Sequence, residues 1–121
     1  MNKRDCLLRN AFSLNVNFDR KSTNRAVRVS NDEKGNWVCT VAYLHNNAIV
    51  RKDSLGLYVR TAGWPTRTTA SAIRACLHGG WKLSSWKLHS PNGAVVKVPD
   101  GHNWVKVEDP WVSYYCGWEW Q

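Results

Sequence analysis

The stretch Ala26–His45, AVRVSNDEKGNWVCTVAYLH, decides the fold class of this chain. Apolar and polar residues alternate on both sides of Asn31–Asn36, a cluster of the residue types that favour tight turns. Alternation with a period of two is typical of a strand with one buried face, and two such strands joined by a short turn form a hairpin. The stretch therefore predicts antiparallel strands at about 26–30 and 36–44.

The next residues, NNAIVRKDSLGLYVRTAG, predict a second hairpin with strands at 48–51 and 55–61, because β-branched and aromatic residues dominate both arms. The periodicity then changes. In TTASAIRACLHGG the apolar residues recur at helical spacing, after threonines that are good N-cap residues and before two glycines that favour a helix end. We expect one short helix at about 69–78.

Two turn signals, Pro91–Gly93 and Pro99–Gly101, divide the residues after this helix. We expect one strand before, one between and one after these turns, at about 81–89, 94–98 and 103–107. The triplet Trp-Lys-Leu occurs twice within the first of these strands, but its two copies are five residues apart and do not fit one face of a strand. We interpret the repetition as coincidence.

The chain is thus predicted to be α+β, with a mainly antiparallel β-sheet of hairpins and one short helix. Its 121 residues are enough for one hydrophobic core, so we expect a single domain over 1–121. The basic start at 1–11 is expected to be loosely ordered, with a strand near 12–18. The last residues, 108–121, form an aromatic, acidic tail.

The formal net charge is +8, from 17 Lys and Arg against 9 Asp and Glu. Three of the acids lie in the tail, which has no Lys or Arg, so the rest of the chain carries +11. A basic body of this kind attracts phosphates, nucleic acid or an acidic protein surface. The plain alternative is a basic protein whose charge serves solubility alone.

Tryptophan is unusually frequent: the chain has eight, and seven of them lie in its second half. So many large side chains are hard to bury in a small core, and we expect some to be exposed, where they suit nucleobases or a partner protein. The four cysteines are more than thirty residues apart, which excludes a compact zinc ribbon. The opening MNKRDCLLRNAF lacks the apolar run of a secretory signal, and no run of apolar residues is long enough to span a membrane. We expect free thiols and a cytoplasmic location, with no membrane partner.

The corner Ala62–Thr69, AGWPTRTT, has two interpretations. In the first it is a turn from strand to helix around a buried Trp64, because Gly permits a positive φ, Pro fixes φ, and Thr hydroxyls cap helices. In the second, the free amides of the helix start and three nearby arginines form a phosphate site. Those arginines are Arg60, Arg67 and Arg74. The last two share a helix face only if the helix begins by Arg67.

A second basic and aromatic set falls on the strands predicted near the end of the chain. It consists of Lys82, Trp86, Lys87, Lys97, Trp104 and Lys106. On one exposed face, Lys would neutralise phosphates while Trp stacked on bases. The alternative is ordinary alternation, with Trp turned inward and Lys outward.

Catalysis has little support. The histidines at 45, 78, 89 and 102 lack the spacing of a metal-binding helix, and the chain has no phosphate-binding loop, nucleophile elbow or paired carboxylates. We therefore expect a protein that is not an enzyme and that needs no cofactor and no metal.

One region of the sequence resembles a known family. Its pieces are Asn47–Val50, the corner Ala62–Thr69, Ile73-Arg74 and Trp104-Val105, within about residues 45–107. In this order they are similar to a family of small, functionally uncharacterised bacteriophage proteins, from which the chain departs by having Ala62 in place of the usual Gly and Pro65 at a variable position. The resemblance implies a phage origin, hence a host-cell cytoplasm, and a β-rich domain with one helix, but no activity.

These observations favour a small phage-encoded module that binds DNA or RNA through its basic surface. The expected phosphate contacts are Arg60, Arg67, Arg74, Lys82 and Lys87, with Trp86 as a stacking platform. The alternative is an accessory protein that binds and inhibits a host enzyme or defence complex through its aromatic tail. The anchors in that case would be Trp111, Tyr114, Tyr115, Trp118 and Trp120.

Overall fold

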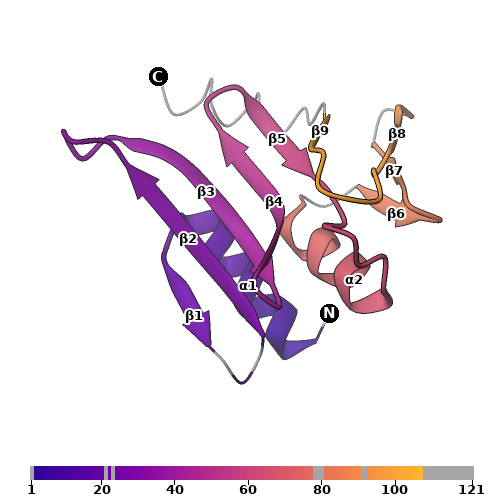
Figure 1. Cartoon of the computed structure of the whole chain (residues 1–121), viewed down its shortest axis with the longest axis horizontal. Coiled ribbons are helices and arrows are strands. Elements are labelled where there is room, and N and C mark those ends of the chain that lie inside the picture. Colours follow the sequence, from indigo (N-terminus) through magenta and orange to yellow (C-terminus); the bar gives the residue numbers. More distant parts are fainter. Residues whose placement is uncertain (1, 21, 23, 78–80, 91–92, 108–121) are drawn as a thin grey trace.

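A computed structural model describes residues 2–20, 22, 24–77, 81–90 and 93–107. Over these residues the protein is α+β, with two antiparallel sheets and two helices (Figure 1). The large sheet contains, in spatial order, β1 (Phe18–Arg20), β2 (Arg25–Asn31), β3 (Trp37–Leu44), β4 (Asn47–Asp53), β5 (Gly56–Val59) and β9 (Val105–Val107). The small sheet contains β6 (Lys82–Ser84), β7 (Lys87–His89) and β8 (Val95–Lys97), and the helices are α1 (Lys3–Leu14) and α2 (Arg67–Cys76).

The two hairpins predicted from the sequence are confirmed as β2–β3 and β4–β5, and the turns between successive strands explain the register of the large sheet. Asp32 accepts hydrogen bonds from the backbone amides of Lys34 and Asn36, both at 2.9 Å, in the turn between β2 and β3. These bonds, led by the one from Asn36, lower the pKa of the Asp32 carboxyl. Between β3 and β4, His45 and Asn46 have φ of 50° and 64°, the left-handed backbone of a two-residue hairpin loop.

The expectations of a loosely ordered start at 1–11 and a strand near 12–18 are wrong, because residues 3–14 form helix α1. Asn2 caps it by accepting from the amide of Asp5 at 2.8 Å, and Asn15, in the left-handed conformation, ends it. The helix buries Leu8, Ala11 and Phe12 at i, i+3 and i+4. The other apolar residues of this helix, Cys6, Leu7 and Leu14, are not fully buried, so its stability comes from the packing of a narrow face, which local sequence does not reveal.

The expected strand over 81–89 is two strands, β6 and β7, joined by a turn at Ser85 and Trp86 with φ of 50° and 59°. Leu83 and Leu88 lie opposite each other in the pair, so the repeated Trp-Lys-Leu places a leucine of each copy on the same face. The strand predicted at 103–107 does not join this sheet. It is β9, which pairs with β5 at the edge of the large sheet.

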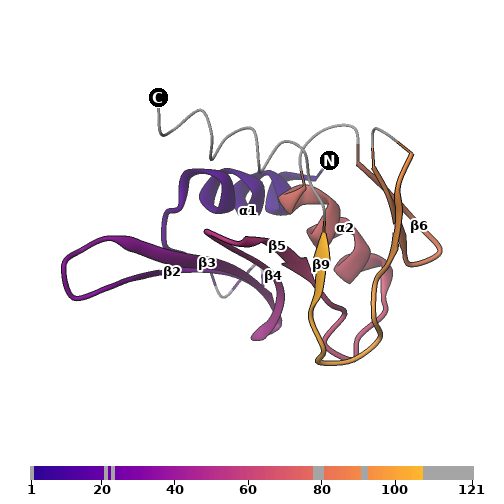
Figure 2. The same cartoon turned by 90° about the horizontal axis from the view of Figure 1, so that it is seen from above.

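Figure 2 shows α1 along one side of the large sheet and α2 between the large and small sheets. The two helices pack against each other, and their apolar faces meet the inner face of the large sheet. Asp5 on α1 connects three elements: its Oδ1 accepts from Nε of Arg25 on β2 at 2.9 Å, and its Oδ2 accepts from the hydroxyl of Ser71 on α2. Helix α1 does not cover the opposite, outer face of the large sheet.

Among the described cysteines, Cys6, Cys39 and Cys76 are free thiols. Burial raises the pKa of the Cys76 thiol, and the nearby Asp5 carboxylate acts in the same direction while Lys52 opposes it. Cys76 packs in the core as a small apolar residue and not as a reactive thiol.

Candidate nucleic-acid interface

The face of the large sheet that points away from α1 carries a basic and aromatic row. Its members are direct cross-strand partners in five successive strands: Arg28 on β2, Val41 on β3, Arg51 on β4, Tyr58 on β5 and Lys106 on β9. Residues that pair across an antiparallel sheet project from the same face. With strands about 4.8 Å apart, this row extends over about 19 Å. We call the surface that contains it the open face.

The side chains of the open face are accessible. Arg28 and Lys106 are exposed, and Arg51 and Tyr58 are half-buried. The guanidinium of Arg28 lies 5.7 Å from the ring centroid of Tyr43, which is diagonal to it on β3. An ion pair of 3.8 Å joins Arg28 to Asp19, but both side chains are more than half exposed, so solvent screens this pair. Arg28 therefore keeps its positive charge available to a ligand.

Lys106 reaches along the open face from the edge strand β9. Its aliphatic stem passes over Gly56 at the start of β5, where an added Cβ would lie 2.8 Å from Cε of Lys106. Glycine at this position, with φ of 151°, thus leaves room for the stem. Arg51 lies 3.5 Å from Asp53, whose carboxylate also accepts from the amides of Leu55 and Gly56 in the β4–β5 turn.

Arg60, one of the phosphate contacts expected from the sequence, lies at the end of the open face and is held by the protein. Its Nε donates to the carbonyl of Ala48 at 2.8 Å and its Nη1 to the carbonyl of His102 at 2.7 Å. Its guanidinium also stacks over Trp104 at 4.2 Å from the ring centroid. Arg60 therefore fixes the loop after β8 to the large sheet with two of its five N–H donors, and its ring contact with Trp104 restrains the guanidinium further.

The structure separates the other expected phosphate contacts into two groups. Arg67 and Arg74 are exposed on α2, which begins at Arg67, so the condition for their sharing a helix face is met. Lys82 and Lys87 are exposed on the outer face of the small sheet, where Lys97 lies directly opposite Lys87. The basic and aromatic set that was expected on one final sheet is thus divided, because Lys106 belongs to the large sheet.

The corner Ala62–Thr69 is the expected strand-to-helix turn. Thr66 caps α2 by accepting from the amide of Thr69 at 3.2 Å. Ala62 has φ of 55°, a left-handed backbone that favours glycine, which explains why Gly would suit this position better than Ala. The expectation of a buried Trp64 is wrong: its side chain is 62% exposed. It lines a pocket of about 490 Å³ together with His45 and the corner threonines.

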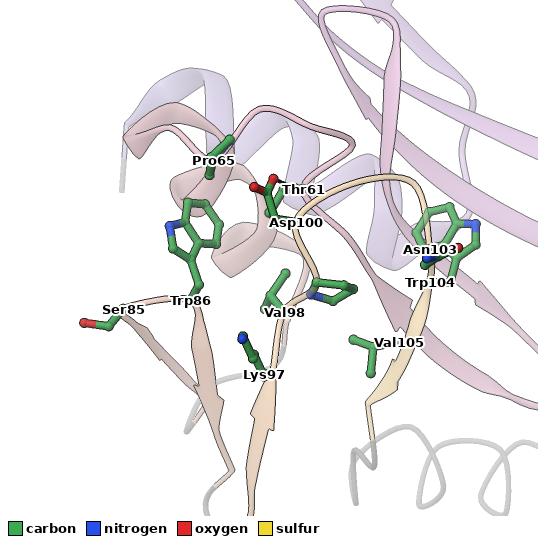
Figure 3. Close-up of a pocket in the computed structure, with 11 residues that line it drawn as sticks. Thr61, Pro65, Ser85, Trp86, Lys97, Val98, Asp100, Asn103, Trp104 and Val105 are labelled. Carbon is green, nitrogen blue, oxygen red and sulfur yellow. Dashed lines mark hydrogen bonds between the residues drawn. The ribbon is translucent and has the colours of Figure 1, made fainter.

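A larger groove of about 720 Å³ lies between the small sheet and β9 (Figure 3). Trp86 lines one end of it, near Pro65, and Trp104 and Asn103 line the other, with Val98 and Val105 between them. Its volume is in the range of small-molecule sites. Trp86, the expected stacking platform, is therefore half-buried and lines a groove, away from the row on the open face.

The sequence did not reveal the open face, because its key residues come from strands far apart in the chain. A signal was present, since Arg28, Arg51 and Tyr58 occupy positions of alternating strands that project away from the buried residues. Only the strand register brings these positions together. The aromatic anchors predicted in the tail, Trp111, Tyr114, Tyr115, Trp118 and Trp120, lie outside the described residues.

Two other kinds of site, a metal site and a membrane-spanning helix, have no support among the described residues. Among the described residues, no group of three or more His, Cys, Asp or Glu side chains is arranged to hold a metal ion. Neither α1 nor α2 is long and apolar enough to span a membrane.

Comparison with known proteins gives the family. The family model described as Kyanoviridae Gp96 protein matches residues 1–85. The match overlaps the resemblance noted at 45–107, extends it to the beginning of the chain and ends just before Trp86. No curated protein and no solved structure matches the chain significantly. Because the matched residues make up well over half of the 121, the chain belongs to the Kyanoviridae Gp96 protein family, a family of bacteriophage proteins.

Proposed function

We propose that this phage protein is a non-enzymatic module that binds nucleic acid on the open face of its large sheet. The observation that supports this proposal most strongly is the cross-strand row of Arg28, Arg51, Tyr58 and Lys106. Cations neutralise phosphates, and aromatic rings on the same surface stack on bases. A sheet offers both at fixed spacing without any change of backbone conformation.

The charge distribution favours a polyanion as the ligand. Arg28, Arg51 and Lys106 are spread over about 19 Å, which is several times the spacing of phosphates along one strand of a duplex. Of the acids near this row, Asp53 accepts from two amides of the β4–β5 turn, and Asp19 forms only a solvent-screened pair with Arg28. A single phosphate would need a compact cluster of donors, whereas this elongated arrangement suits a backbone with many phosphates.

The test is a titration of fluorescein-labelled DNA and RNA, single-stranded and duplex, with the full chain at several salt concentrations. For the double variant Arg28→Gln/Lys106→Gln we expect weaker binding and a less steep dependence of log K on log salt. Loss of two phosphate contacts reduces that slope by about 1.8 for duplex DNA and about 1.4 for a single strand. Binding by fluorescence anisotropy gives both quantities.

The matched control is Lys3→Gln/Arg9→Gln on α1. Both residues are exposed, and the change in net charge is the same, but they lie on the helix that covers the other face of the sheet. We expect this control to keep most of the slope of the unaltered protein. Equal losses in the two variants would show that only net charge matters, and absence of binding to every nucleic acid would refute the proposal.

The aromatic tail supports a second candidate function, contact with a host protein, because acidic and Trp-rich segments suit protein surfaces better than phosphates. The two functions differ in their response to salt and to truncation. Binding that persists at high salt and is lost when the chain is cut after Asp109 would favour the protein partner. Binding that weakens steeply with salt and survives this truncation would favour nucleic acid.

A further inference from the structure

We propose that the groove between β8 and β9 receives unpaired bases, so that the protein prefers single strands over duplexes. This inference rests on the proposed function, because the phosphates of the same strand would lie on the open face. The ligand class is thus a single-stranded nucleic acid, recognised by its backbone on one surface and by its base rings in the adjacent groove.

The lining of the groove suits a flat ring. Trp86 and Trp104 supply aromatic surfaces at its two ends, and the partly exposed Val105 and the almost fully buried Val98 lie between them (Figure 3). Bases of any sequence stack on tryptophan, because every base has a π-face. A phosphate, in contrast, would lose its hydration beside the valines and would face the carboxylate of Asp100.

Polar groups in the groove match the edge of a base. Asn103 is exposed, and no hydrogen bond joins its side-chain amide to any other described residue, so its donors and its acceptor are available. Asp100 accepts from the hydroxyl of Thr61 at 3.0 Å and is held in place by that bond. Lys97 lines the groove beside Lys87, so that positive charge lies at its margin.

The backbone at Trp86 is a second, independent observation. Trp86 has φ of 59° in a two-residue turn where Asn or Gly is the favoured residue. A bulky side chain in the left-handed region is unfavourable, because its Cβ comes too close to the following carbonyl oxygen. Trp86 is only half-buried, so core packing uses part of its ring and leaves the rest to line the groove. A ligand that stacks on this ring accounts for the presence of a Trp at a strained position.

The groove and the open face meet at Trp104. The guanidinium of Arg60 covers this ring at 4.2 Å, and Trp104 lies two residues before Lys106 of the basic row. In Figure 2 the loop from β8 to β9 lies on the side of the large sheet away from α1, which is also the side of the open face. A strand that follows the row towards β9 would therefore arrive at the groove.

The experiment compares a 12-nucleotide single strand with its duplex, using anisotropy, for the full chain and for Trp86→Leu. We expect the unaltered protein to bind the single strand more tightly. Trp86→Leu should lower the single-strand affinity about fivefold or more, as expected for one lost base stack, and leave the duplex affinity unchanged. Trp86→Phe, which keeps an aromatic ring, should restore part of the difference. The matched control is Trp64→Leu, which removes an exposed Trp outside the groove and should change neither affinity.

A second probe does not depend on altering the protein. Replacing two central nucleotides of the single strand by abasic sites keeps the phosphates and removes the rings, and we expect the affinity to fall as it does for Trp86→Leu. A 2-aminopurine at the same place should lose fluorescence on binding to the unaltered protein only. Equal affinity for strand and duplex, or full affinity for the abasic strand, would refute base binding in the groove but not phosphate binding on the open face. Absence of binding to both single strand and duplex would refute both proposals, the groove and the open face.

Discussion

At the scale of single residues, Asp5 holds the N-terminal helix in place. Its carboxylate accepts from Arg25 at 2.9 Å and from Ser71, and the side chains of Asp5 and Arg25 are 0% and 4% exposed. Burying a charge costs desolvation free energy, and the attraction between the two charges offsets this cost only while both are present. Asp5 thus connects α1 with β2 and α2, three elements that are distant in sequence.

We expect Asp5→Ala to lower the free energy of unfolding by about 3–5 kcal/mol, because it leaves the guanidinium of Arg25 buried without its carboxylate. Urea unfolding followed by circular dichroism measures this change. Ser71→Ala removes only one hydrogen bond to the same carboxylate and should cost about 1 kcal/mol. If both variants lost the same small amount, the ion pair would not hold α1 in the way described.

At the scale of elements, Thr61 links the corner to the loop that carries the groove. Its hydroxyl donates to Asp100 at 3.0 Å and accepts from the amides of Gly63 at 3.2 Å and Gly101 at 3.0 Å. The residue is buried and lies two positions after the end of β5. One side chain therefore positions both the turn into α2 and the β8–β9 loop.

We expect Thr61→Val, which keeps the shape and removes the hydroxyl, to lower the free energy of unfolding by about 1–3 kcal/mol through unsatisfied buried groups. Amide hydrogen exchange should increase at Gly63 and Gly101 first, since both donate to that hydroxyl. Thr68→Val is the control, because Thr68 is exposed on α2. Unchanged exchange at Gly101 in Thr61→Val would show that the loop is held by other contacts.

Elements with local turn and cap signals could be predicted from the sequence, and elements that depend on distant contacts could not. The β2–β3 and β4–β5 hairpins depend on local turns and alternation, both readable within a dozen residues, and α2 has a local cap at Thr66. Helix α1 depends on Asp5 and on packing against distant elements, so its polar sequence suggested a loose start. The turn at Ser85 and Trp86 has a left-handed backbone without Gly or Asn, and no local rule indicates a turn there.

At the scale of the whole molecule, strand order creates the candidate site. Arg28 and Lys106 are 78 positions apart in the printed sequence and lie in one row because β2, β3, β4, β5 and β9 are neighbours. Basic composition indicated a nucleic-acid ligand, but composition cannot say which cations share a face. Arg60, which the sequence suggested as a phosphate contact, also anchors the loop that joins the two sheets.

The most direct test of the open face is NMR mapping of the ¹⁵N-labelled chain, whose mass of 13.8 kDa suits the method. During titration with a 12-nucleotide single strand, we expect the largest amide shifts at Arg28, Arg51, Tyr58 and Lys106, and small shifts along α1. Shifts confined to α2 and the outer face of the small sheet, or no shifts at saturating strand, would contradict the assignment of this surface.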